Sequence, residues 1–455
     1  MTAPTTVSSR DSWATRLGFI LAAVGSAVGL GNMWRFSYVA AEGGGAAFVV
    51  VYLLFVGFIG IPIMTAEFVV GRMTQISPAL AVKRLGGTAW LPLGALYVFS
   101  GFGILSYYSV IAGWTMRYAA DGMLGRLSGD TTAYFQSVAT GAPAVIAHLL
   151  FMAITVFIVI GGVKRGLERT AFILMPLLFL LLIGLALWAA TLTDAGTGYS
   201  YYLRPQLREL LNPNVIGLAA GQAFFSLSLG MGALMTYASY LKSRENLGKE
   251  AATVALTDFG VAFVAGLVVF PIIMHFGLGE TIGLGAISDN TVGTLFIALP
   301  AGLQSLGTVG TVVTVAFFVM LFFAALTSAI SLLEVVVAAI VDGWRWARTT
   351  AALVAGAVTA LAGLPAAFSL EFLDAADKLV GNFLLIAGGL FTSILVGHVI
   401  LSKADAELAE GLPYVAARRA WALFVRWVAP VVLIIVLYFS APPTWSALKT
   451  LLGIG

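Results

Sequence analysis

Two short stretches rich in glycine and serine interrupt long apolar runs in this sequence. They are residues 25–32 (GSAVGLGN) and residues 226–232 (SLSLGMG), about 200 residues apart. Glycine destabilises a helix interior by about 1 kcal/mol relative to alanine, so we expect both runs to unwind there. Unwound backbone presents carbonyl oxygens, which suit hard cations, and N–H groups, which attract carboxylates. The pair predicts one site for a small zwitterion or anion with monovalent cations, the alternative being close helix packing through small residues.

Hydroxyl side chains near these stretches are candidates to complete a cation site. Two belong to the second stretch, and two lie in the apolar run that begins near residue 309. A single serine or threonine in a helix often bonds back to the carbonyl one turn earlier, so the candidates carry weight only as a group. They are Ser226, Ser228, Thr327 and Ser328.

Three carboxylates are flanked by apolar residues, and ionisable groups at membrane depth are costly enough to suggest a function. We expect Asp258 to neutralise a bound cation, with a solvated position near the cytoplasmic end as the alternative. We expect Glu67 and Glu334 to accept hydrogen bonds from the N–H groups that a broken helix frees.

Four charged residues near the ends of apolar runs form two candidate gates. Arg35 follows the first stretch toward the outside, and Asp377 begins a later run on the same side. Arg10 and Asp342 lie toward the inside. Two such pairs suit a protein that opens to one side at a time. Aromatic candidates for a lid, which can also be ordinary packing residues, are Tyr108 and Phe225.

The composition decides what surrounds these residues. Of 455 residues, 60% are hydrophobic and 10% are charged, whereas soluble domains carry about 25% charge. This predicts an all-α polytopic membrane protein in contact with the lipid bilayer. The net charge of +3 and the scattered basic residues give no footprint for nucleic acid. Without cysteine and with three histidines that lack a partnered nucleophile, the chain is not expected to be an enzyme.

Eleven apolar runs are long enough to cross a bilayer. They cover residues 13–37, 46–71, 89–121, 144–162, 167–191, 215–240, 250–277, 309–341, 347–368, 375–401 and 420–441. The interrupted runs are the first and the sixth, and each begins a block of five, as expected for a 5+5 inverted repeat plus one C-terminal helix. The predicted parts are an N-terminal tail (1–12), a first repeat (13–191), a second repeat (215–401), and a loop with the eleventh helix (402–455).

Lysine and arginine concentrate in alternate loops, and such loops face the cytoplasm. This predicts a cytoplasmic N-terminus, a C-terminus outside, and a multi-pass location in the cell inner (plasma) membrane. The loop 278–308 contains no lysine or arginine, so we expect it outside, with short helices of its own.

The chain resembles the neurotransmitter:sodium symporter family, in its bacterial amino-acid-transporter branch with the leucine-transporter fold. The resemblance covers most of the ten-span core. It rests on WATRLG (13–18), GLGNMWRF (29–36), EGGG (42–45), GQAFFSLS (221–228), TYASY (236–240) and FAALTS (323–328).

This resemblance implies two sodium ions, an amino-acid substrate and no organic cofactor. The first ion would be bound by the Ala27 carbonyl, Asn32, Ser226 and the substrate carboxylate, with Asp258 beside it. The second would be bound by carbonyls of Gly25, Val28 and Ala324 and hydroxyls of Thr327 and Ser328. The substrate would contact Ser26, Ala27, Leu30, Gly31, Ile104, Tyr108, Phe225, Ser226, Ser228, Met231, Ser328 and Leu332.

The resemblance also assigns the gates. Arg35 and Asp377 with Tyr108 and Phe225 would close the outside. Arg10 and Asp342, supported by Trp13 and Tyr240, would close the inside.

Two positions distinguish this chain within the family. Amine-transporting members carry aspartate where this chain has Gly29, so its substrate is expected to bring its own carboxylate. Asp258 stands where chloride-dependent members usually have asparagine, with Tyr52, Gln222 and Ser226 at the matching chloride positions. This predicts transport independent of chloride, with proton counter-transport through Asp258 as a weaker hypothesis.

The predicted substrate is a hydrophobic or aromatic amino acid, because the implied pocket is apolar and Met231 adapts to irregular shapes. Small alanine or glycine is the alternative if Ile104, Met231 and Leu332 close the pocket. A non-transporting amino-acid sensor on the same fold would keep the same site. The oligomeric state and the role of the N-terminal tail are not readable from the sequence.

Overall fold

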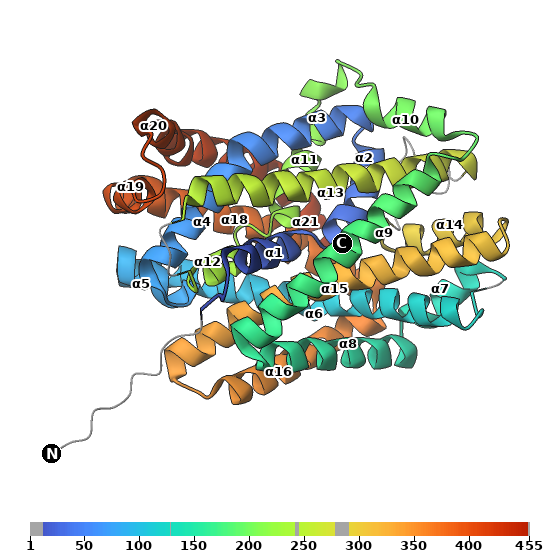
Figure 1. The fold of residues 1–455 in the computed structure, drawn as a ribbon, viewed down its shortest axis with the longest axis horizontal. Helices are drawn as coiled ribbons and strands as arrows, with labels where there is room; N and C mark the ends of the chain where they lie inside the picture. Colours follow the sequence, from blue (N-terminus) through green and yellow to red (C-terminus); the bar gives the residue numbers. More distant parts are fainter. Residues whose placement is uncertain (1–11, 128, 242–244, 278–290, 454–455) are drawn as a thin grey trace.

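The computed structural model describes residues 12–127, 129–241, 245–277 and 291–453 of the chain. These residues form helices joined by short turns, with no β-strand in the described ranges. The longer helices run side by side along the long axis of the molecule (Figure 1). An all-helical membrane protein satisfies its backbone hydrogen bonds within each segment, which is what lipid surroundings demand.

The helices of the first half include several π-helical or 3₁₀ segments, labelled η. They are α1 (Arg16–Ala27), η1 (Gly31–Arg35), α2 (Phe36–Glu42), α3 (Ala46–Phe55), η2 (Val56–Gly60), α4 (Ile61–Thr74), α5 (Pro78–Gly86), η3 (Thr88–Trp90), α6 (Leu91–Met123), α7 (Thr131–Ala139), α8 (Ala142–Ile160), η4 (Val163–Glu168), α9 (Arg169–Ala189), α10 (Ala195–Leu203) and η5 (Glu209–Leu211).

The second half continues in the same way. Its segments are α11 (Pro213–Ser226), α12 (Ala233–Ala238), α13 (Leu247–His275), α14 (Thr291–Gln304), α15 (Thr308–Trp344), α16 (Arg348–Phe368), α17 (Leu370–Ala376), η6 (Asp377–Leu384), α18 (Leu385–Ile394), η7 (Leu395–Val399), α19 (Leu401–Ala409), α20 (Val415–Leu423), η8 (Phe424–Val428) and α21 (Ala429–Leu452). α14 is a helix of the kind expected within the loop 278–308, whose first part (278–290) lies outside the described residues.

Within the described ranges, nine continuous helical segments are long and apolar enough to cross a membrane, or ten if the bent first pair is one span. The predicted count of eleven requires α11 and α12 to form one further span. Each of these two helices is too short to cross alone, because the second break divides them. The count of eleven therefore stays a prediction.

The first predicted interruption is present. α1 ends at Ala27, the next residue, Val28, has extended backbone angles, and the continuation Gly31–Glu42 is bent by 58° relative to α1. The second interruption separates α11 from α12. α12 contacts α1, and α11 contacts η1, so the two broken helices lie against each other although they are distant in sequence.

The second break depends on residues that accept positive φ angles. Gly230 and Gly232 have φ of 76° and 75°, and Ser228 has φ of 53°. The backbone of Gly230 also lies directly against α18, so a side chain there would collide with the carbonyl oxygen of Leu385. Glycine is thus required at 230 both by its φ angle and by a close backbone approach.

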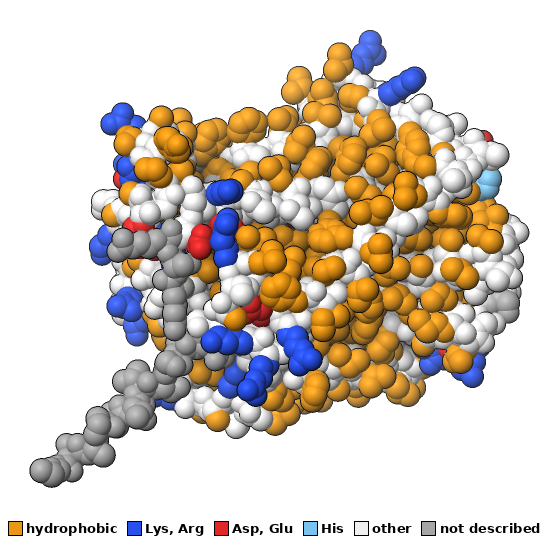
Figure 2. Space-filling view, in the orientation of Figure 1, with side chains coloured by type: hydrophobic (Ala, Val, Ile, Leu, Met, Phe, Trp, Pro, Cys, Tyr) orange, Lys and Arg blue, Asp and Glu red, His pale blue; other side chains and the backbone are white. Residues whose placement is uncertain are grey.

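Large apolar side chains cover much of the outer surface, including Leu180, Leu187 and Phe157, each at least 68% exposed. Figure 2 shows this apolar surface over the long helices, with lysine and arginine gathered mainly at the end that carries α5 and α19. A surface this apolar is unfavourable in water and fits hydrocarbon surroundings.

Replacing Gly230 with alanine should destabilise the protein by about 1–3 kcal/mol, because the side chain adds a strained φ and a collision with α18. Thermal unfolding in detergent measures this as a lower midpoint. Gly217→Ala is the matched control in α11, where an added methyl meets no atom within 4 Å. An unchanged midpoint for Gly230→Ala would contradict the assigned backbone conformation.

Candidate functional site

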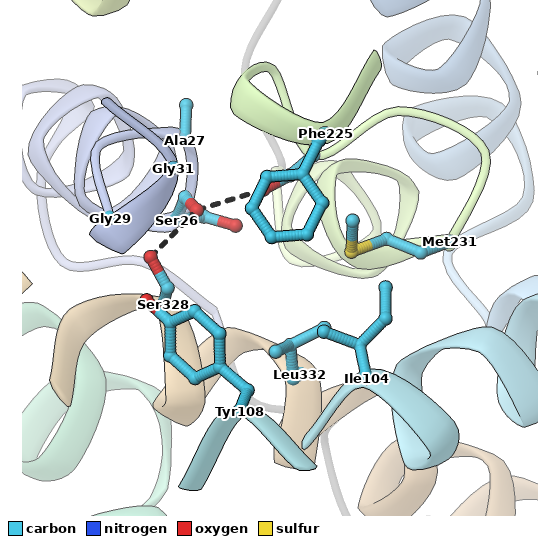
Figure 3. A pocket seen from close by; sticks show the side chains of 11 residues that line it. Ser26, Ala27, Gly29, Gly31, Ile104, Tyr108, Phe225, Met231, Ser328 and Leu332 are labelled. Atoms are coloured by element: carbon cyan, nitrogen blue, oxygen red, sulfur yellow. Dashed lines mark hydrogen bonds between the residues drawn. The ribbon is translucent and has the colours of Figure 1, made fainter. Parts of the chain in front are cut away.

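A narrow cavity of about 20 Å³ lies where the two broken helices meet α6 and α15. Figure 3 shows its lining. Ten of the twelve residues predicted to contact the substrate line it, together with Gly29. They are Ser26, Ala27, Gly31, Ile104, Tyr108, Phe225, Ser228, Met231, Ser328 and Leu332. The other two, Leu30 and Ser226, are not in this lining and belong to the adjoining hydrogen-bond clusters.

One end of the cavity is polar. In Figure 3 the Tyr108 hydroxyl lies beside Ser328, whose hydroxyl donates to the backbone carbonyl oxygen of Ser26 at 3.2 Å. Tyr108 Oη accepts a hydrogen bond of 3.1 Å from the backbone N–H of Leu30, a group freed by the first break. Ser26 Oγ donates to Ser331 Oγ at 2.8 Å. This end thus places an N–H group and a phenol where the predicted substrate carboxylate would lie.

The opposite end of the cavity is apolar. Phe225 and Met231 come from the second broken helix, Ile104 from α6 and Leu332 from α15 (Figure 3). The cavity holds about one water molecule, for which about 10–15 Å³ suffices. An amino acid therefore needs these apolar side chains to move apart before it can enter.

The predicted second sodium site is a cluster of oxygens between α1 and α15. Ser328 Oγ lies 3.4 Å from the Gly25 carbonyl oxygen and 3.4 Å from that of Val28. Thr327 Oγ1 lies 3.0 Å from the carbonyl oxygen of Ala324. All five predicted ligands thus lie close together, because Gly25 packs against the Thr327 side chain and so brings the two groups of contacts side by side. Carbonyl and hydroxyl oxygens without a carboxylate suit a monovalent hard cation.

The predicted first sodium site centres on Asp258 of α13, which is fully buried. Asn32 Nδ2 donates to Asp258 Oδ1 at 2.6 Å and to Ser226 Oγ at 3.0 Å. Ser226 Oγ donates to Asp258 Oδ2 at 2.7 Å, and the Tyr52 hydroxyl donates to the same oxygen at 3.4 Å. The solvated alternative for Asp258 is therefore wrong, because its carboxylate has protein partners on both oxygens.

Glu67 behaves as expected. Its Oε1 accepts a 2.8 Å hydrogen bond from the backbone N–H of Gly230, so α4 supports the second break. The same expectation for Glu334 is wrong. Glu334 instead accepts from the Tyr240 hydroxyl at 2.6 Å and from both terminal nitrogens of Arg348, at 3.0 and 2.5 Å. A charged guanidinium is a better partner for a buried carboxylate than a backbone N–H group.

The outer gate residues meet on one side of the cavity. Arg35 Nε lies 3.8 Å from Asp377 Oδ2, and the Arg35 guanidinium stacks over the Phe225 ring at 4.7 Å. Tyr107, a residue to which sequence reasoning gave no role, donates to Asp377 Oδ1 at 2.9 Å. Tyr108 lies one residue further along α6 and lines the cavity. The assignment of Tyr108 to the outer gate stays a prediction.

The inner gate is described only in part, because Arg10 lies outside the described residues. Asp342 Oδ2 accepts a 2.6 Å hydrogen bond from the backbone N–H of Ser77. Trp13 and Tyr240, the other two residues of the predicted inner gate, have ring centroids 6.3 Å apart, and the backbone N–H of Trp13 donates to the Tyr240 carbonyl at 3.4 Å. These contacts join the start of α1 to the end of α12.

Several contacts of the site were missed by sequence reasoning. Arg35 also donates to Gln222 Oε1 at 3.0 Å and to Asn382, and Gln222 Nε2 donates to the Gly31 carbonyl at 2.7 Å. The amide of Gln222 therefore connects the outer gate to the first break. The one hint of this contact in the sequence is that Gln222 lies four residues before the candidate ligand Ser226.

The comparisons with known proteins agree with this geometry. Residues 10–138 and 140–447 match the profile of the Sodium:neurotransmitter symporter family. An uncharacterized sodium-dependent transporter of Bacillus subtilis, YhdH, is 36% identical over 444 residues, covering 93% of this chain and 96% of that protein. The sodium- and chloride-dependent taurine transporter of Bos taurus is 26% identical over 388 residues, covering 73% of this chain and 61% of that protein.

A solved structure extends the likeness to three dimensions. The crystal structure of MhsT in complex with L-phenylalanine is similar with a TM-score of 0.86 and 39% sequence identity, covering 95% of this chain and 100% of that chain. The broken helices, the cavity between them and the family match lead to one conclusion: the chain belongs to the sodium:neurotransmitter symporter family and has the leucine-transporter fold.

Proposed function

We propose that this protein is a sodium-coupled symporter of hydrophobic or aromatic amino acids that works by alternating access. The observation that carries the proposal is the cavity between the broken helices, which has one polar and one apolar end. A free amino acid has the same division, with charged groups at one end and a side chain at the other. Along the first broken helix, one set of proposed gate contacts, around Trp13, precedes the cavity-lining residues 26–31, and the other, around Arg35, follows them.

The substrate carboxylate binds the N–H groups of Leu30 and Gly31 and the hydroxyl of Tyr108. Its ammonium binds carbonyls around Ala27, Phe225 and Ser226. Gly29 supports a substrate with its own carboxylate, because a Cβ atom there would lie 2.9 Å from the Tyr108 oxygen. An aspartate at this position, as amine transporters of the family carry, would compete with that tyrosine for space.

Two sodium ions accompany the substrate. The Asn32, Ser226 and Asp258 cluster supports the first ion, and the oxygen cluster of Gly25, Val28, Ala324, Thr327 and Ser328 supports the second. Binding of the first ion replaces hydrogen bonds that these oxygens make to one another with ion–oxygen contacts. The substrate carboxylate completes that shell, which couples the substrate to the ion.

Transport is independent of chloride. Two sodium ions add a charge of +2, and Asp258 with the substrate carboxylate supplies −2, which leaves the ammonium to the carbonyl dipoles. The full burial of Asp258 beside Asn32 and Ser226 supports this role. The bovine relative named above is chloride-dependent, so the anion requirement is a point of divergence within the family.

Two observations support an apolar substrate. One end of the cavity is apolar, and the structure of the similar protein MhsT contains L-phenylalanine. Phe225, Met231, Ile104 and Leu332 provide no charged or hydrogen-bonding side chain there. A charged or polar substrate side chain would lose its hydration without gaining a partner.

The proposed arrangement in the cell follows the distribution of lysine and arginine. The chain lies in the inner (plasma) membrane with its N-terminus in the cytoplasm and its C-terminus outside. Residues 13–191 and 215–401 form the two inverted repeats, and the repeat interface holds the substrate at mid-membrane depth.

Replacing chloride with gluconate should leave sodium-driven uptake of L-phenylalanine into proteoliposomes within about twofold of its original rate. Asp258→Asn should reduce uptake at least tenfold in gluconate, since the fixed negative charge is lost, and chloride should restore part of it. Asp374→Asn, at a partly exposed surface carboxylate, is the control. Uptake that stops in gluconate for the unmodified protein would refute the role of Asp258.

Competition by a panel of twenty amino acids should favour large apolar side chains. Ile104→Ala should increase the preference for the largest of them about tenfold over alanine, because one methylene is worth about 1–3 kcal/mol in such a pocket. Accumulation of labelled substrate against its gradient distinguishes transport from a sensor, which binds without accumulating. Preferential competition by alanine and glycine would select the alternative of a small-substrate symporter.

Tyr107→Phe should weaken the outer gate, because it removes a hydrogen bond to the Asp377 carboxylate worth about 1.5 kcal/mol. We expect substrate bound from the outside to dissociate about tenfold faster, measured by release of labelled L-phenylalanine in detergent. Tyr118→Phe on the same helix is the matched control, since the Tyr118 hydroxyl is buried and has no hydrogen-bond partner among the described residues. Equal release from both variants would show that Tyr107 does not hold the gate.

A further inference from the structure

The start of α1 is held by a carboxylate that neither gate includes. Glu168, the last residue of η4, is 4% exposed and uses both oxygens. Its Oε2 accepts from the backbone N–H of Ala14 at 2.7 Å. Its Oε1 accepts from the backbone N–H of Thr15 at 3.1 Å and from the Thr15 hydroxyl at 2.8 Å. Glu168 thus receives three hydrogen bonds from two successive residues.

Thr15 connects Glu168 to the first turn of α1 through its hydroxyl group. Its hydroxyl donates to Glu168 and also accepts a 2.9 Å hydrogen bond from the backbone N–H of Gly18, which makes Thr15 the N-cap of α1. The first N–H groups of a helix carry a partial positive charge that a carboxylate stabilises. Glu168 is therefore an extension of the N-cap that comes from another helix.

Gly18 makes room for the carboxylate. A Cβ atom at this position would overlap the side chain of Glu168, with its Cγ only 2.5 Å away. The φ of Gly18 is not positive, so the need for glycine here is the space that Glu168 fills. The two residues form a matched contact between α1 and η4.

A second buried carboxylate holds the other flank. Glu250 of α13 is fully buried, and its Oε1 accepts from Nε and Nη2 of Arg16 at 2.8 and 2.5 Å. Arg16 Nε also lies 3.3 Å from Glu245 Oε2. α1 contacts both η4 and α13, so its first turn is held by two segments that each contribute one carboxylate.

Helix α1, whose first turn these carboxylates hold, ends at the proposed ion site. α1 is a single helix of 12 residues, about 18 Å long, that ends at Ala27 beside the first break. Gly25 and Val28 at that end supply carbonyls to the second cation cluster. A displacement at the start of this short rigid helix therefore reaches the ion ligands.

We propose that Glu168 is a positioning residue that keeps the N-terminal half of the broken first helix closed on the cytoplasmic side, with Glu250 holding the opposite flank through Arg16. Opening toward the cytoplasm requires the three hydrogen bonds to Glu168 to break. The proposal builds on alternating access and adds a latch distinct from the predicted inner gate of Arg10, Asp342, Trp13 and Tyr240.

Distance measurements between two spin labels test this, because the chain has no native cysteine to compete for labelling. One label replaces exposed Leu17 on α1, and the other replaces exposed Lys83 on α5. Glu168→Gln should raise the ratio of long to short distances about tenfold in sodium-free buffer. Glu371→Gln, an exposed carboxylate on α17, should leave the distances unchanged.

Gly18→Ala tests the same contact from the other side and should reproduce the shift by displacing the carboxylate. The double variant should shift no further than either single variant, because both break one contact. If Glu168→Gln does not fold, Thr15→Val removes one of the three bonds to Glu168 together with the N-cap bond from Gly18, and should give about a threefold shift.

Three results would overturn the latch: unchanged distances in the Glu168 variant, unchanged distances in the Gly18 variant, or additive shifts in the double variant. The label experiment needs no transport, so it is separate from the test of function. Distances that shift in a protein without sodium-coupled uptake would refute the proposed function and leave the latch standing.

Discussion

The architecture depends on one constraint: backbone N–H and C=O groups inside a membrane need hydrogen-bond partners. Both helix breaks free such groups, and side chains from other helices satisfy them. The N–H of Leu30 donates to Tyr108, that of Gly230 to Glu67, and the carbonyl of Ser26 accepts from Ser228 at 2.8 Å. The proposed substrate would use the same polar groups as these side chains, so the requirement for satisfied backbone and the proposed binding site coincide.

Charged groups in the described interior follow a second rule, that burial is tolerated when partners are close. Asp258 is surrounded by donors from three other segments, and Glu334 is paired with Arg348. Arg35 contacts the Asp377 carboxylate, two side-chain amide oxygens and the Phe225 ring. No single one of these contacts dominates its placement. Such divided contacts suit a gate, because each can be exchanged for water at modest cost.

Sequence reasoning predicted residue types better than partners. It identified both Glu67 and Glu334 as helix-break supports, yet only Glu67 has that role, because Arg348 in the next helix pairs with Glu334. It singled out Tyr108 and gave no role to Tyr107, which donates a hydrogen bond to Asp377. Neighbouring residues on a helix differ in direction by about 100°, and no pattern within α6 says which one faces the gate.

The sequence by itself determined the all-helical membrane class and the position of both breaks, because hydropathy and glycine content act locally along the chain. It also determined most of the cavity lining through motif resemblance. Three contacts were decided only by the tertiary structure. Glu168 caps the start of α1, the absence of a side chain at Gly18 leaves space for Glu168, and Gln222 bonds both Arg35 and the Gly31 carbonyl at the first break. These contacts join residues 150 or more positions apart, and their formation depends on how helices pack rather than on any local preference.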